Sequence, residues 1–399
     1  MKSANGRPEP GGRKPRVALV AHDVHDHGGM ERAFAELIRQ GHESVDFVVV
    51  SAELAPDLRP LVEWRRVVLP TRPFPLKFLA FGLAAGVKLR SVEADIVHTM
   101  GAIVPNRADV ACVQFCHAGF RAATGRLAPP DSPLPRRLNS GLARALALAA
   151  ERWCYRPARL RRFAAVSRGV AGELRQHYPS VPVAVTPNGV DPDRFRPDAD
   201  VRRVVRGAQR VADEELVLLF VGGDWDRKGL GVAIEGMASA QPRLDVPLQL
   251  WVVGRGDESR FAGLAGRHGV GERIRFFGPR ADTERFFQAS DVFVLPTLYE
   301  TFSLVAYEAA ASALPFVGTR VSGIDELAAG GEAGVLVPRE PVAVADALVA
   351  LAADPARRVR MGEAGRRRAG GYTWGRSVES VLSLYRELRA PGAGARSPG

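Results

Sequence analysis

Short apolar runs alternate with helix-like segments along almost the whole chain, and this alternation limits the possible folds more than any other feature. Apolar strands separated by helices are typical of parallel sheets that are buried on both faces. The sequence therefore predicts an α/β fold with two doubly wound sheets, one for each series of runs. The first series is Val17–Ala21, Phe47–Val50, Val67–Leu69, Asp95–His98, Val110–Phe115, Phe163–Val166 and Val183–Val185. The second series is Leu216–Val221, Leu248–Val253, Ile274–Phe277, Val292–Leu295, Phe316–Val317 and Val335–Val337.

The turn-rich segment Thr186–Asp193, TPNGVDPD, separates the two series and has the composition of a hinge or linker. A chain of 399 residues is long enough for two domains that each bury a core. Because doubly wound sheets bind ligands beyond the carboxyl ends of their strands, we expect the two domains to face a central cleft. The predicted parts are a disordered tail over residues 1–15, Rossmann-like domains over 16–190 and 191–371, a C-terminal helix over 372–389 that packs back across the interface, and a disordered tail over 390–399.

Two carboxylates bracket the segment from Glu300 to Glu308, ETFSLVAYE, which follows the apolar run Val292–Leu295 and opens an Ala-rich helical pattern. A strand that turns into a helix leaves unpaired N–H groups at residues such as Ser303 and Leu304, and these groups favour an anion such as phosphate. The flanking carboxylates can accept hydrogen bonds from hydroxyl groups. Phosphate and hydroxyl groups together describe a nucleotide sugar.

Two adjacent cations, Arg227 and Lys228, follow the run Leu216–Val221 and a glycine pair. They are suited to neutralising a diphosphate. Since this turn and the Glu300 segment lie at strand ends of the same predicted sheet, we expect both to line one ligand site. The alternative is an exposed charged turn with no ligand.

The first predicted strand ends in a loop that carries the glycine pair Gly28 and Gly29. Adjacent glycines allow a ligand to approach the backbone closely, although an ordinary strand-to-helix turn would also explain them. Three histidines and two aspartates between His22 and His27 could instead suggest a metal. Their alternate spacing in one loop fits no standard ligand pattern, and we predict no metal site.

Two histidines lie at predicted strand ends. His117 follows the run Val110–Phe115, and His98 ends the run Asp95–His98. A histidine in such a place can orient a hydroxyl or exchange a proton near neutral pH. The alternative for each is a hydrogen-bonded structural histidine, which we favour for His98.

The whole formal net charge of +11 falls in residues 1–190, and residues 191–399 are neutral. The first domain should therefore favour an anionic acceptor or surface, unless the charge reflects only a solvated arginine-rich face. One basic segment, Arg136–Arg162, could lie on an anionic membrane, but a helix packed on its own sheet is the preferred interpretation. Its predicted apolar face consists of Leu138, Leu142, Leu146, Ala149 and Trp153.

The cysteine content and the apolar segments indicate the cellular compartment in which the protein is expected. The three cysteines, Cys112, Cys116 and Cys154, form no even framework, which indicates reduced thiols. The N-terminus lacks the apolar stretch of a signal peptide, and Phe74–Val87 is too short to span a bilayer. We expect a cytoplasmic protein, or one held at the inner face of a membrane.

In their order and spacing, these segments resemble the retaining GT-B glycosyltransferases of family 4, from about Val17 to Leu388. The chain departs from the family pattern at Ser303 and at Ala313, where glycine is common. Because both residues are small, these departures bear more on which donor is bound than on whether the chain is active. The matching motifs are GGxE at Gly28–Glu31, NGVD at Asn188–Asp191, R/K-K-G at Arg227–Gly229, the two glutamates of E-x7-E at Glu300 and Glu308, and GxxEL at Gly323–Leu327.

The resemblance implies a role for each motif. The cations would hold the donor diphosphate, with Gly28 and Gly29 against its phosphates; Glu308 would bind the ribose hydroxyls; and Glu300, with the backbone after it, would hold the sugar next to His117. It implies a nucleotide-diphosphate-sugar co-substrate and neither a metal nor a resident cofactor. The catalytic candidates are His117, Arg227, Lys228 and Glu300. The donor-binding candidates are Gly28, Gly29, Arg227, Lys228, Glu300, Phe302, Ser303, Leu304, Val305 and Glu308.

The activity that the resemblance implies is transfer of a sugar to a glycan, glycolipid, lipid-linked or small-molecule acceptor with retention of anomeric configuration, as in the synthesis of cell-envelope polysaccharides or glycolipids. A GT-B-shaped sugar-nucleotide epimerase is the alternative enzyme. A basic nucleic-acid-binding protein is a remote alternative that rests only on the net charge and predicts steep salt dependence, and we expect no nucleic-acid partner.

Overall fold

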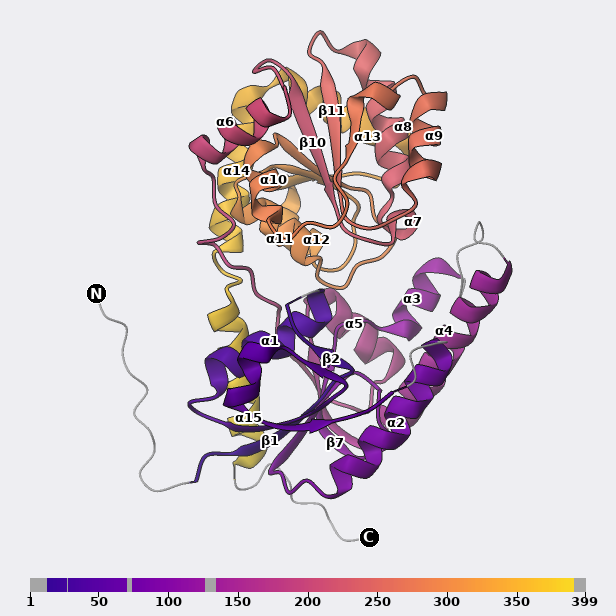
Figure 1. Ribbon diagram of the computed structural model, residues 1–399, viewed down its shortest axis with the longest axis vertical. Helices are drawn as coiled ribbons and strands as arrows, with labels where there is room; N and C mark the ends of the chain where they lie inside the picture. Colours follow the sequence, from indigo (N-terminus) through magenta and orange to yellow (C-terminus); the bar gives the residue numbers. More distant parts are fainter. Residues whose placement is uncertain (1–12, 27, 70–73, 126–133, 391–399) are drawn as a thin grey trace, which may run out of the picture. The chain divides into compact units, whose positions relative to one another are not determined.

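The computed structural model describes residues 13–26, 28–69, 74–125 and 134–390, which form two large parallel sheets as the alternation predicts (Figure 1). Their strand orders are β5-β3-β1-β6-β7-β8-β9 and β12-β11-β10-β13-β14-β15, and a small sheet pairs β2 with β4. The strands before the turn-rich segment are β1 (Arg16–Val20), β2 (Asp23–Val24), β3 (Asp46–Ser51), β4 (Glu53–Leu54), β5 (Glu63–Arg66), β6 (Ile96–Met100), β7 (Ala108–Val113), β8 (Leu160–Ala165) and β9 (Val183–Val185). Those after it are β10 (Leu216–Val221), β11 (Leu248–Val253), β12 (Ile274–Phe276), β13 (Val292–Leu295), β14 (Phe316–Gly318) and β15 (Gly334–Leu336).

Helices connect most of the successive strands, as is usual for parallel pairing, although β6 and β7 are joined by a loop. Those up to β9 are α1 (Gly29–Gly41), η1 (Pro56–Leu61), α2 (Phe74–Arg90), α3 (His117–Thr124), α4 (Leu134–Cys154) and α5 (Arg168–His177). Those from there to β13 are α6 (Ala199–Ala208), α7 (Trp225–Lys228), α8 (Leu230–Ala240), η2 (Gln241–Arg243), α9 (Glu258–Arg267), η3 (Gly271–Arg273) and α10 (Thr283–Ala289). The last are α11 (Leu304–Ala311), α12 (Ile324–Ala328), η4 (Ala329–Gly331), α13 (Pro341–Ala353), α14 (Pro355–Ala369) and α15 (Trp374–Arg389).

By their internal contacts, the described residues form two compact units. The first comprises the described parts of Met1–Cys112, Ala149–Phe163 and Leu382–Gly399. The second comprises the described parts of Val113–Leu148 and Ala164–Val381. The predicted boundaries after residues 190 and 371 follow the two sheets instead of these units, and they stay predictions.

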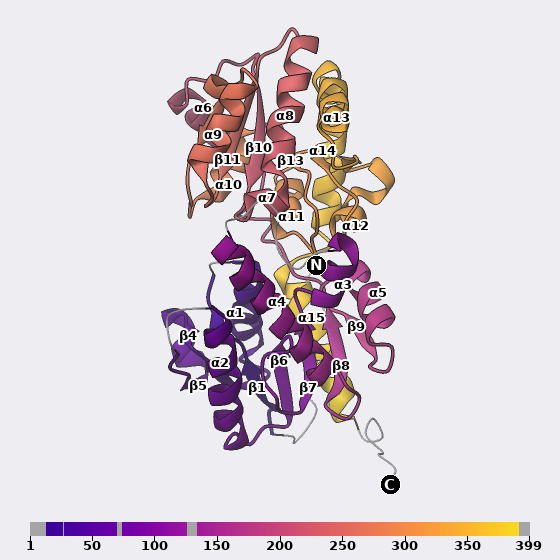
Figure 2. The same ribbon diagram turned by 90° about the vertical axis from the view of Figure 1, so that its right-hand side faces the viewer.

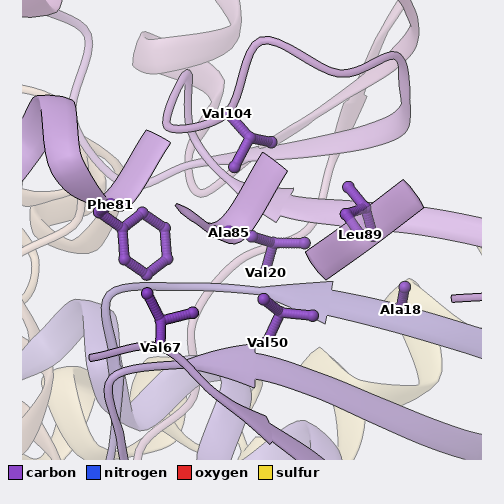
Figure 3. Close-up of a cluster of buried hydrophobic side chains, with 8 residues drawn as sticks. All are labelled: Ala18, Val20, Val50, Val67, Phe81, Ala85, Leu89 and Val104. Carbon is purple, nitrogen blue, oxygen red and sulfur yellow. The ribbon is translucent and has the colours of Figure 1, made fainter. Parts of the chain in front are cut away.

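The core of the first unit forms where α2 covers β1 and β3. The side chains of Phe81, Ala85 and Leu89 point from one face of α2 toward the strands (Figure 3). They meet Val20 of β1 and Val50 of β3, and all five side chains are buried. Such close packing of apolar side chains is what holds a helix on a sheet.

In the second unit, helices cover both faces of the six-stranded sheet. Figure 1 shows α8, α9 and α13 on one side of the sheet and α10, α11 and α14 on the other. Helices α8 and α13 lie side by side in both views (Figure 2). A Cβ atom on Gly236 of α8 would lie 2.7 Å from Val344 of α13, so this glycine allows the close approach of the two helices.

Four predicted strands agree with the structure residue for residue. Three of them, β10, β11 and β13, are fully buried, and the fourth, β9, is half-buried. The prediction of a strand at Val67–Leu69 is wrong, because the strand is Glu63–Arg66, which reads EWRR. This is the edge strand of its sheet, and its polar side chains give no apolar run.

Candidate active site

The turn that carries the two predicted cations is held against the neighbouring strand by glycines. Gly222, directly after β10, has φ 137°, and Gly229, after α7, has φ 85°. A Cβ atom on Gly229 would lie 2.1 Å from the carbonyl oxygen of Pro296, which follows β13. Since β13 pairs with β10, this contact fixes the end of α7 beside the segment that leads to Glu300.

Arg227, Lys228 and Glu300 lie together at these strand ends. Arg227 Nη1 donates to the backbone oxygen of Tyr299 at 2.6 Å and to Glu300 Oε1 at 3.1 Å. The Nζ atom of Lys228 lies 3.4 Å from the same carboxylate oxygen. All three charged side chains are largely buried. The two segments therefore lie close together, as the sequence predicts, and their binding of one ligand stays a prediction.

The charge of Arg227 is maintained by its neighbours. Burial alone would lower the pKa of Arg227, but the carboxylates of Glu300 and Asp224 outweigh burial and hold this pKa above its ordinary value. Asp224 accepts a hydrogen bond from Arg227 Nε at 2.9 Å. The guanidinium therefore stays charged and fixed in orientation, which suits a planar contact with an anionic oxygen.

The segment after Glu300 turns sharply into helix α11. Ser303, the residue before the helix, has φ 67°, and its buried Oγ atom has no hydrogen-bond partner among the described residues. The helix begins at Leu304, followed by Val305, so the first N–H groups have no acceptor within the helix. An unpaired hydroxyl and a helix N-terminus at one place favour an anion or a sugar hydroxyl.

The remaining predicted residues of this segment are buried. Phe302 stacks on Tyr307 with ring centroids 4.0 Å apart and an angle of 10° between the planes. The backbone of Phe302 lies close to Gly323. A Cβ atom added to Gly323 would lie 2.3 Å from the carbonyl oxygen of Phe302. Glu308 is buried on α11. The side chain of Phe302 thus packs in the core, and its backbone shapes the turn.

His117 lies in the same unit as the charge cluster. It begins α3, and its ring lies 4.9 Å from that of Phe115. Phe115 in turn contacts Tyr299 at 5.2 Å, and the Tyr299 hydroxyl donates to Cys116 O at 3.2 Å. Because Tyr299 directly precedes Glu300, this aromatic packing joins the start of α3 to the carboxylate.

Sequence reasoning missed Arg144 as a member of this charged neighbourhood. It lies on α4, with its guanidinium carbon 4.4 Å from the ring centroid of Phe120. Burial lowers the pKa of Arg144, while the charge of Asp224 raises it and that of Arg227 lowers it. Helical periodicity showed only that Arg144 lies off the predicted apolar face, and its proximity to α7 depends on packing between distant segments.

Gly28 and Gly29 lie in the first unit, directly before and at the start of α1. Gly28 has φ 106°, and a Cβ atom on it would lie 2.3 Å from the carboxylate of Glu31. Glu31 thus folds back over the turn, which accounts for a GGxE pattern at a helix start. Contact of these glycines with the donor stays a prediction.

His98 is a structural residue, as the sequence interpretation favoured. It is buried, and its Nδ1 atom lies 2.6 Å from the hydroxyl of Tyr385 on α15. Burial lowers the pKa of His98 to about 3, so the ring is neutral at physiological pH. His22 resembles it: burial lowers its pKa to about 4, and its ring packs 4.1 Å from that of Phe81.

The basic helix differs from its prediction in length and in its buried face. α4 ends at Cys154, before the predicted end at Arg162, and β8 begins at Leu160. Leu142, Ala149 and Trp153 of the predicted apolar face are exposed, whereas Leu148 is buried. The prediction that this set of side chains packs on the sheet is therefore wrong for these three residues. Among the described residues, no helix has both the length and the apolar character needed to cross a bilayer.

Two family models match the chain. Residues 27–194 match the model of Glycosyltransferase Family 4, and residues 215–354 match that of Glycosyl transferases group 1. The chain is 30% identical to a D-inositol 3-phosphate glycosyltransferase of Geodermatophilus obscurus, over 90% of this chain and 85% of the relative. It is 29% identical to the protein of that name from Streptomyces avermitilis, over 94% and 88% of the two chains.

Solved structures share the fold. WaaG, a glycosyltransferase involved in lipopolysaccharide biosynthesis, aligns with a TM-score of 0.78 at 21% identity, covering 92% of this chain and 99% of WaaG. Sucrose-phosphate synthase from Thermosynechococcus elongatus aligns with a TM-score of 0.77 at 20% identity, covering 94% and 99%. Anabaena HepE, solved with UDP-glucose, aligns with a TM-score of 0.68 at 17% identity, covering 93% and 100%. The predicted GT-B fold class is confirmed.

Proposed function

Because the chain belongs to the glycosyltransferases of family 4, we propose that it transfers a sugar from a nucleotide-diphosphate-sugar donor to an anionic acceptor with net retention of anomeric configuration. The contact of Arg227 and Lys228 with Glu300, beside the start of α11, is the observation that carries this proposal. It combines cations for a diphosphate with a carboxylate and free backbone N–H groups for a sugar.

Each part of the cluster has a role in the proposed reaction. When the bond between the anomeric carbon and the diphosphate breaks, its electron pair stays on the leaving oxygen. Arg227, Lys228 and the N-terminus of α11 would stabilise that charge. The acceptor hydroxyl would form its bond to the anomeric carbon on the same face, and its proton would pass to the leaving diphosphate oxygen. His117 would orient hydroxyls of the sugar, and Glu308 would bind the ribose hydroxyls.

The acceptor class follows from charge and from the relatives. The net charge of +11 falls entirely in residues 1–190. The Geodermatophilus and Streptomyces relatives are named for an inositol phosphate acceptor. Both observations support an acceptor that carries a phosphate or another anionic group, free or linked to a lipid.

Thermal-shift screening of nucleotide sugars, followed by product analysis, tests the proposal. We expect one donor to raise the melting temperature by mass action, and Lys228→Ala to remove that shift. Arg243→Ala is the matched control, because Arg243 forms an exposed ion pair with Asp346 elsewhere in the second unit. With donor and a phosphorylated acceptor, NMR should show a new glycosidic bond of the donor's anomeric configuration. Conversion of the sugar nucleotide without acceptor would instead identify an epimerase.

A further inference from the structure

Helix α2 is apolar on two opposite faces. One face packs on the first sheet through Phe81, Ala85 and Leu89 (Figure 3). The other face carries four large apolar side chains at helical spacing, and nothing among the described residues buries them. These are Leu76, Leu79, Leu83 and Val87, which are 51%, 48%, 70% and 64% exposed.

This outer face is unusual for a surface helix. A helix that covers a sheet normally exposes charged and polar side chains on its outer side. Val68, six residues before the start of α2 in the sequence, is also 82% exposed. Adjoining exposed apolar side chains of this size mark a surface that is covered by a partner or a membrane.

The charges around the face indicate what covers it. The sequence has no aspartate or glutamate between Glu63 and Glu93, a segment that contains all of α2. Lys88 and Arg90, near the end of the helix, are exposed. Lys77 of α2 pairs with Asp23 of β2 at 3.7 Å, so this cation is compensated. Apolar side chains flanked by Lys88 and Arg90, with no acid on the helix itself, match the surface of an anionic bilayer, where the apolar groups enter the acyl boundary and the cations meet lipid phosphates.

A second copy of the chain fits this face poorly. In a symmetric dimer the same patch meets itself, so the cations of α2 would face cations with no acid on the helix to pair with them. Like charges brought together in this way oppose association.

With 17 residues, α2 is also too short to cross a bilayer.

We propose that the outer face of α2 binds the surface of an anionic lipid bilayer, with the helix lying in the plane of the interface. This inference does not rest on the proposed transfer reaction, because it concerns a different surface and is tested by binding instead of turnover. It places the membrane contact on α2 and not on the basic helix α4, for which the sequence offered a membrane only as the less favoured alternative.

Co-sedimentation of the full chain with lipid vesicles tests the proposal. We expect binding to phosphatidylcholine vesicles that contain about one third phosphatidylglycerol, and much weaker binding to pure phosphatidylcholine. The double variant Leu79→Gln/Leu83→Gln should lower the partition coefficient on the order of tenfold or more, because two apolar side chains no longer enter the lipid. Lys88→Gln/Arg90→Gln should lower binding to the anionic vesicles roughly fivefold for each charge.

The chain offers a matched control in the second unit. Val342 and Val359 are 65% and 61% exposed, so Val342→Gln/Val359→Gln removes similar exposed apolar area and should leave vesicle binding unchanged. Unchanged melting temperatures would show that all variants fold. Equal binding by wild type and the α2 variants would overturn the proposal. So would self-association of the wild type that the α2 variants abolish, without vesicle binding, because it would identify a second copy as the partner.

Discussion

At the residue scale, Glu300 sets how much of the charge of Arg227 and Lys228 is available to a ligand. Its carboxylate lies 3.1 Å from Arg227 and 3.4 Å from Lys228. A bound diphosphate would compete with Glu300 for both cations. The carboxylate would then become available to hydroxyl groups of the sugar, and the proposed function would couple donor binding and sugar recognition through this one side chain.

The variant Glu300→Gln should separate binding from turnover. Without the carboxylate, both cations are left for the diphosphate, so affinity for the nucleoside diphosphate should stay equal or increase. Loss of sugar positioning should lower kcat about 100-fold. Calorimetry and initial rates measure the two effects, and Asp226→Asn, which breaks the exposed contact with Arg260, is the control. Loss of diphosphate affinity with kcat unchanged would contradict this role.

Gly229→Ala should destabilise the second unit. The new Cβ atom would lie 2.1 Å from Pro296 O, at a positive φ that alone costs about 1–2 kcal/mol. We expect a loss of about 2 kcal/mol or more in the free energy of unfolding in urea, together with weaker donor binding. Gly266→Ala in α9 has open space around it and should be neutral or slightly stabilising. Equal effects of the two variants would show that the close approach at Gly229 does not matter.

At the element scale, a sequence prediction was accurate where the pattern reflects the burial of a strand and failed where the structure depends on other contacts. Fully buried strands such as β10 and β11 carry uninterrupted apolar runs, and their bounds were predicted to the residue. The edge strand β5 was missed because its side chains are polar. The proximity of Arg227 and Glu300 was predictable, because both residues follow the carboxyl ends of strands, and these ends lie together in a doubly wound sheet. Arg144 was not, because its position depends on helix packing.

Helix α15 contributes the partner of a buried histidine, and this contact has a consequence for pH dependence. Burial depresses the pKa of His98 to about 3 and that of His22 to about 4, compared with 6.5 in the unfolded chain. Below pH 6.5 the unfolded chain therefore takes up protons that the folded chain does not, and stability falls as pH falls. From pH 6.5 to 5.5 we expect a loss of about 1 kcal/mol for each histidine.

Urea unfolding at both pH values measures this effect. His98→Asn retains a polar side chain beside the Tyr385 hydroxyl but does not titrate, so its stability should depend less on pH than that of the wild type. An identical pH dependence in both proteins would show that His98 is protonated equally in the folded and unfolded chain.

At the scale of the whole molecule, charge is divided unequally along the chain. Residues 1–190 carry the formal net charge of +11, and residues 191–399, which include Arg227, Lys228 and Glu300, are neutral. Two kinds of anion recognition follow. In the proposed reaction the donor would meet a few buried charges at fixed positions, while an anionic acceptor would be attracted by many charges near the surface.

This division predicts different responses to salt. Exposed charges are screened strongly and largely buried ones weakly. The KM for an anionic acceptor should therefore rise with ionic strength more steeply than the KM for the donor. Steady-state kinetics over a range of sodium chloride concentrations measures both, with an uncharged analogue of the acceptor as the control. A parallel rise of the two KM values would contradict the separate roles.

The proposed function depends above all on Arg227 and Lys228 holding the donor diphosphate at the start of α11. Calorimetric titration of the stabilising nucleotide sugar into the wild type and into Lys228→Gln measures the contribution of this contact. Loss of one buried charge-assisted contact should raise Kd at least about tenfold. An unchanged Kd in Lys228→Gln, with the protein folded, would show that the donor binds elsewhere.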